Sequence, residues 1–159
     1  MKINLTLSLF FCLITLVIFS QKKKDIKKYK ILCISVTDTE NGKTLNDSKT
    51  HYNALGKMIT EINYDSTGRL KNTIRYKYLN GSELSEEIKY DARNVIIEKK
   101  TYKYNFFGEK TVEQLLDKNA RTILRFEYIY NAKGLKTERR TYDAANKLIS
   151  VKKYNYNCK

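Results

Sequence analysis

The chain of 159 residues has few of the side chains from which catalytic and metal sites are usually built. His51 is its single histidine, and its three cysteines form no Cys-x-x-Cys pair. A metal site therefore has too few ligands. There is no glycine-rich phosphate loop, and Ser and Asp occur mainly where turns need them. The sequence predicts a protein that is not an enzyme and binds no cofactor or metal.

Proline and tryptophan are absent and acidic residues are scarce, whereas tyrosine and lysine are abundant. The chain has 13 Tyr, and 31 Lys and Arg against 17 Asp and Glu, which gives a formal net charge of +14. Such a charge predicts salt-dependent attraction to anionic surfaces without identifying a partner. We expect the partner to be an unknown protein or an anionic envelope surface.

The N-terminus resembles a targeting segment. Residues 1–21 combine a positive start at Lys2, an apolar run from Leu5 to Phe19 and a small residue at Ser20-Gln21 where a signal peptidase could cut. We expect a cleaved signal peptide and an exported protein in the periplasm, at the cell surface or outside the cell. The basic leader, residues 22–30, leaves an uncleaved anchor as an alternative, in which case this segment would be the protein's only membrane contact.

The rest of the chain, residues 31–159, is organised by two series of markers, and the step between markers is constant within each series. One series is Tyr52, Tyr78, Tyr104, Tyr130 and Tyr156, and the second is Tyr64, Tyr90, Leu116 and Tyr142. Most markers are followed by Asp or Asn, two variable residues, and Gly or Asn. Asp or Asn opens a type I turn, and Gly accepts the left-handed backbone that closes a three-residue hairpin loop. The predicted turn glycines are Gly56, Gly68, Gly108 and Gly134.

Between the turns, the sequence alternates with a period of two, which predicts strands and no helix. A three-residue loop pairs Tyr64 with Leu70, so paired residues would share parity throughout the sheet. Twelve of the 13 tyrosines are even-numbered, and Tyr29 is the exception. We therefore expect one tyrosine-rich face and one basic face. Because the two sets would lie on opposite faces, binding of single-stranded nucleic acid is not expected.

The fold class predicted is all-β, an antiparallel meander of about ten strands built from 26-residue hairpins. The marker spacing staggers the strands and tilts them by about 35°, near the tilt of a closed barrel. We expect closure or near-closure, with a strongly coiled open sheet as the alternative. Closure would bring Cys33 and Cys158 together as a possible disulfide, whereas an open sheet would hold them about 43 Å apart. Two unpaired thiols remain the simpler expectation.

The segment Tyr64–Leu70, "YDSTGRL", resembles the YD repeats of the RHS-like proteins, and the resemblance extends over residues 50–157. RHS-like proteins form large curled β-shells around a cargo or at a cell surface, but this chain is too short to enclose a toxin. The resemblance implies hairpin-repeat architecture and a secreted or surface setting. MORN-like repeats are an alternative, although the chain has only six glycines.

These observations favour an exported, non-catalytic interaction or structural module at the cell envelope or outside the cell. The alternative is a carrier that holds a small apolar or aromatic ligand in the tyrosine-lined interior of a barrel.

Overall fold

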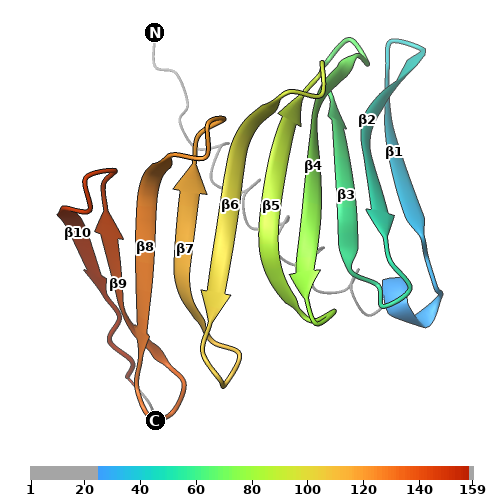
Figure 1. The fold of residues 1–159 in the computed structure, drawn as a ribbon. Coiled ribbons are helices and arrows are strands. Elements are labelled where there is room, and N and C mark those ends of the chain that lie inside the picture. Colours follow the sequence, from blue (N-terminus) through green and yellow to red (C-terminus); the bar gives the residue numbers. More distant parts are fainter. Residues whose placement is uncertain (1–24, 158–159) are drawn as a thin grey trace, which may run out of the picture.

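The computed structural model describes residues 25–157, and all the strands in this range belong to one antiparallel sheet. Its ten strands follow chain order from β1 to β10 in a meander (Figure 1). The strands are β1 (Cys33–Glu40), β2 (Lys43–Tyr52), β3 (Met58–Tyr64), β4 (Leu70–Leu79), β5 (Glu83–Asp91), β6 (Ile96–Tyr104), β7 (Lys110–Leu116), β8 (Thr122–Tyr130), β9 (Lys136–Tyr142) and β10 (Leu148–Lys153). The predicted all-β meander is confirmed.

The hairpin turns adopt the geometry that the Asp/Asn-x-x-Gly pattern favours. In the β3–β4 turn, Gly68 N donates to Asp65 O at 2.9 Å and Asp65 N donates to Arg69 O at 2.8 Å. The Asp65 side chain accepts hydrogen bonds from the backbone N–H groups of Thr67 and Arg69. Gly68 has a φ of 77°, where an L side chain is strained. Asn94, Ala120 and Asn146 occupy the same left-handed position in other turns.

A register shift accompanies the turn in each hairpin from β2 onward, and it overturns the predicted division of the faces. Tyr64 pairs with Leu70 as expected, but the next pair is Asn63 with Asn72. One residue of the outgoing strand is therefore unopposed, which is a β-bulge. Beyond it, paired residues have opposite parity, so even-numbered side chains change face from strand to strand.

The tyrosines consequently lie on both faces. Tyr78 and Tyr76 share a face with Glu61, whereas Tyr90 and Tyr142 lie on the opposite one, beside Arg75 and Arg125 respectively. The prediction that all even-numbered tyrosines share one face, with the basic residues on the other, was wrong. The side that carries Glu61, Tyr76 and Tyr78 is called the pocket face below.

The sheet is open, so the predicted closure was also wrong. β1 and β10 lie at opposite edges and each described strand contacts only its neighbours in the chain (Figure 1). The stagger is present, since a row from Ile74 through Lys89 reaches Glu98. Stagger sets the tilt but does not make the edges meet. A barrel closed around the pocket face would also bury the charges of Glu87, Lys100 and Arg139, which is costly.

Without closure, the sheet remains a single layer with almost no core. The buried residues of the described chain are few and scattered: Ile26, Gly56, Asn72, Ile88 and Thr141. They come from separate turns and strands, so no continuous apolar interior joins them.

Part of the basic leader is ordered, because residues 25–28 form one helical turn from which Ile26 packs beside Gly56. Cys33 is exposed in β1. Cys158 lies outside the described residues, as does the predicted signal segment.

Candidate functional site

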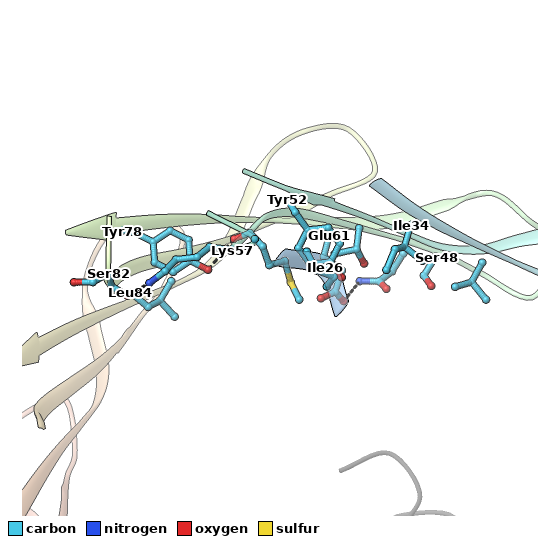
Figure 2. Close-up of a pocket in the computed structure, with 14 residues that line it drawn as sticks. Ile26, Ile34, Ser48, Tyr52, Lys57, Glu61, Tyr78, Ser82 and Leu84 are labelled. Carbon is cyan, nitrogen blue, oxygen red and sulfur yellow. Dashed lines mark hydrogen bonds between the residues drawn. The ribbon is translucent and has the colours of Figure 1, made fainter. Parts of the chain in front are cut away.

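The clearest hollow of the molecule lies on the pocket face, over β1 to β5. It has a volume of about 460 Å³ and is mainly apolar. Figure 2 shows its lining side chains projecting from one side of the sheet, with Ile26 of the helical turn among them. The apolar lining comes from Ile26, Ile34, Val36, Tyr52, Met58, Tyr78 and Leu84. Its polar groups include Glu61, Asn63 and Lys57.

One end of the hollow is held by a tyrosine and a lysine. The Tyr78 hydroxyl donates to the carbonyl of Met58 at 2.8 Å, which fixes the ring against the neighbouring strand β3. Lys57 Nζ lies 5.1 Å from the centre of that ring and donates to Ser82 O. Figure 2 shows Lys57, Tyr78, Ser82 and Leu84 grouped at this end. A small apolar or aromatic ligand would meet a ring, a cation and aliphatic side chains here.

Beyond the hollow, the first tyrosine series forms a row of hydrogen bonds to the backbone. The hydroxyls of Tyr104, Tyr130 and Tyr156 donate to the carbonyls of Leu84, Lys110 and Lys136 at 3.0, 2.8 and 2.8 Å. The donor and acceptor are always 20 residues apart, as for Tyr78 and Met58. Each bond ties a marker to the preceding strand of the sheet, as Tyr78 ties β4 to β3.

A second row on the same face pairs tyrosines with glutamates. The hydroxyls of Tyr76, Tyr102 and Tyr128 donate to the carboxylates of Glu61, Glu87 and Glu113 at 3.2, 3.1 and 2.9 Å. Burial, followed by the nearby glutamates, raises the pKa of all three phenols above the ordinary value. Protonated tyrosine is thus the form that this arrangement favours.

Lysines complete the row in its middle. Lys100 Nζ lies 2.9 Å from Glu87 and Lys110 Nζ lies 2.6 Å from Glu113. Burial acts to raise the pKa of Glu113, but hydrogen bonds from Lys110 and Tyr128 outweigh it, and the pKa falls below its usual range. These charged groups satisfy one another, and nothing in their arrangement resembles a nucleophile held by a base.

The Glu61, Glu87 and Glu113 positions were missed by sequence reasoning. They recur at the same interval as the tyrosine markers, which was a usable signal. They are odd-numbered, however, and the expected parity rule assigned odd residues to the face opposite the tyrosines. The structure brings them together with the even-numbered tyrosines because of the bulges.

The second marker series forms no comparable row. On the opposite face Tyr142 donates to Glu127 at 2.8 Å, and Arg125 stacks 4.1 Å from its ring centre. Arg75 lies 4.6 Å from the Tyr90 ring centre. Leu116 pairs with Thr122 after its own turn. These contacts stabilise the sheet and define no concave site.

Among residues 25–157 no group of three or more His, Cys, Asp or Glu side chains could hold a metal ion. Within the same range, no helix has both the length and the apolar character needed to cross a membrane.

Comparison with known proteins assigns no family. No protein-family model matches the chain, and no curated protein matches it. Among solved structures, a porin-like protein from Bacteroides uniformis is 15% identical with a TM-score of 0.41, over 74% of this chain and 48% of that one. TarM is 13% identical with a TM-score of 0.30, over 88% of this chain and 23% of that one. A Bacteroides fragilis protein of unknown function is 12% identical with a TM-score of 0.30, over 77% and 91%. The chain thus spans about half of the first and a quarter of the second, and similarities this low assign no function.

Proposed function

We propose that the protein is an exported, non-catalytic module of β-hairpin repeats that binds a partner at the cell envelope or outside the cell. The observation that carries this proposal is the open single-layer sheet, in which very few of the described residues are buried. Such a sheet offers two large faces to other molecules. Exposed apolar side chains, such as Phe106 and Phe107 at 98% and 82% exposure, add to its capacity for contact.

The repeat is part of the proposal. The recurring tyrosine hydrogen bonds support a hairpin unit that is copied along the sheet. The resemblance of Tyr64–Leu70 to YD repeats agrees with such a unit and with a surface setting. The excess of Lys and Arg over Asp and Glu favours an anionic partner surface.

Export and binding are tested separately. The full-length chain and a chain lacking residues 1–21 would be expressed in a host with an envelope, and the fractions compared. We expect export of the full-length chain only, with a mature mass that corresponds to cleavage near Ser20-Gln21. The purified mature chain should then sediment with isolated envelopes, and added salt should release it. Retention of the full-length chain in the cytoplasm, or no salt-sensitive sedimentation, would refute the respective half.

A second candidate function is supported by the hollow on the pocket face. We propose as the alternative that it binds a small, neutral, apolar or aromatic ligand. The site would be this open hollow beneath the helical turn, in place of the barrel interior that the sequence suggested.

The alternative is tested with the neutral fluorophore N-phenyl-naphthylamine. Its emission should rise with the wild-type protein and not with Leu84→Lys, which places a charge in the hollow. Val151→Lys is the control, because Val151 is exposed in β10, away from the hollow. Equal binding by both variants would rule this site out.

A further inference from the structure

The last hairpin breaks the tyrosine–glutamate row of the pocket face. Glu61, Glu87 and Glu113 accept hydrogen bonds from Tyr76, Tyr102 and Tyr128. The next position at this spacing is Arg139 in β9, and the next tyrosine is Tyr154. A carboxylate is therefore replaced by a guanidinium at this one position. Tyr154 has no glutamate at the place where the three earlier tyrosines find theirs.

Arg139 stands among other cations of the same face. It pairs across the sheet with Tyr128 on one side and with Lys152 on the other. Lys136 Nζ lies 4.7 Å from the Tyr128 ring centre and 5.6 Å from that of Tyr154. Lys152 Nζ lies 5.5 Å from the Tyr154 ring centre. Lys136, Arg139 and Lys152 are called the cationic cluster.

The cationic cluster lacks negative partners within the described part of the chain. No salt bridge there includes any of its three members, whereas Lys100 and Lys110 on the same face are paired with Glu87 and Glu113. Arg139 Nε is buried and has no hydrogen-bond partner among these residues. A buried N–H donor without an acceptor is costly, and neighbouring positive charges repel one another. A bound oxyanion would relieve the repulsion between the charges.

The arrangement of the cluster bears on which kind of molecule could supply the oxyanion: a small phosphorylated compound, a nucleic acid or a membrane. A guanidinium fork with two ammonium groups nearby on the same face of the sheet suits a dianionic phosphate. Nucleobases need open aromatic faces on which to stack, and here cations lie over the rings of Phe126, Tyr128 and Tyr154. A phosphate would have to contact the other nitrogens of the cluster, since Arg139 Nε has almost no solvent-accessible surface.

We propose that the cationic cluster binds the phosphate group of a soluble ligand, such as a phosphorylated sugar. The inference deepens the proposed function and rests on it, because it names the anionic chemistry that one part of the sheet would recognise. It concerns β8 to β10 and is independent of the apolar hollow over β1 to β5. Phosphate binding is measured on purified protein, so the result does not depend on whether the protein is exported.

The test follows the Nε–Hε cross-peak of Arg139 by NMR while glucose 6-phosphate is added, with glucose as the neutral control. We expect a saturable shift with the phosphate ester only. Arg139→Glu should weaken binding about tenfold or more, since a charge-assisted contact is lost. Arg93→Glu is the matched control, with the same charge change on an exposed turn, and it should weaken binding far less.

Stability separates a ligand-binding role from a structural one. Arg139→Glu restores the residue found at the three equivalent positions and gives Tyr154 an acceptor. We therefore expect its urea midpoint to equal or exceed that of the wild type while phosphate binding falls. If Arg139→Glu does not fold, Arg139→Gln and Lys152→Gln provide the same binding comparison.

Several outcomes would overturn the proposal. These are an unchanged Arg139 cross-peak, equal weakening by Arg139→Glu and Arg93→Glu, or a loss of both stability and binding in Arg139→Glu and Arg139→Gln. Binding to phosphatidic acid vesicles or to single-stranded DNA without binding of the sugar phosphate would assign the cluster to a membrane or a nucleic acid instead.

Discussion

The tyrosine hydroxyls of the pocket face link adjacent strands, and one of them offers a direct test. Tyr102 donates to Glu87 at 3.1 Å, and Glu87 also accepts from Lys100. Tyr102→Phe removes that bond and keeps the ring, so we expect a loss of about 1 kcal/mol in the free energy of unfolding. Urea denaturation would measure it.

The control for this change is Tyr90→Phe. Tyr90 lies on the opposite face with Arg75 over its ring, an interaction that phenylalanine largely keeps. Its effect should stay within about 0.5 kcal/mol. Equal decreases in the free energy of unfolding of the two variants would show that the Tyr102–Glu87 hydrogen bond does not stabilise the fold.

The raised pKa values of Tyr76, Tyr102 and Tyr128 predict a dependence of stability on alkaline pH. Above about pH 10 these phenols ionise in the unfolded chain and remain protonated in the folded one. The unfolded state then binds fewer protons, so stability falls as pH rises. Thermal melts between pH 8 and pH 11 should show this fall. The triple change of these tyrosines to phenylalanine should flatten it, and an unchanged slope would contradict the assignment.

At the residue scale, sequence reasoning could identify recurrent tyrosines but not their partners. Tyr78 and Tyr104 were predicted to face the interior of the sheet, whereas the structure uses their hydroxyls to bind backbone carbonyls of the preceding strands, β3 and β5. A regular spacing indicates repetition. It does not say which neighbour a side chain will reach, because that depends on the register between strands.

The hairpin turn is the element whose geometry the sequence defines best. Asp65 with Gly68 and Asn131 with Gly134 give the same turn, with the first side chain accepting two backbone N–H bonds. The bulge that follows could not be predicted, since most residues tolerate it. A faint signal is the hydroxyl of Thr111, which donates to the Lys103 carbonyl across the bulge.

Ala120 occupies the left-handed turn position with a φ of 60°. Ala120→Gly should therefore raise the free energy of unfolding by about 1 kcal/mol, because glycine adopts this conformation without strain. Differential scanning calorimetry would show the gain as a higher Tm.

Ala145→Gly is the matched control in another turn near this end of the sheet. Ala145 is absent from the residues with positive φ in the described chain. Glycine there only adds freedom to the unfolded state, so we expect no gain and a small loss. A gain at both sites would mean that the left-handed strain at Ala120 is not the cause.

At the scale of the whole molecule, strand order followed from the sequence but closure did not. The even spacing of turns such as Tyr64–Leu70 and Asp91–Val95 is enough to predict a meander. The stagger was correctly inferred, yet the charges of Glu87 and Arg139 on the pocket face were not expected to lie beside its tyrosines. Charged side chains on the pocket face make an enclosed interior unfavourable, whereas the predicted faces had made it favourable.

An open sheet predicts a gradient of backbone protection. β1 and β10 each pair on one side only, whereas β4 to β7 are paired on both. Amide hydrogen exchange should be fastest in the two edge strands and slowest near β5, where Ile88 is buried. Uniform protection, or strong protection of the unpaired edge of β10, would indicate that the edges are covered in solution.

Each described strand contacts only the strands next to it in the sequence, and this bears on how the number of hairpins could change. No described strand depends on a partner distant in sequence, so the number of hairpins is not set by any requirement that the two ends meet. Loss or duplication of one hairpin would leave every remaining junction of the same kind as before. The width of the sheet could then change by duplication or loss of hairpins, without any change in the side chains of the remaining hairpins.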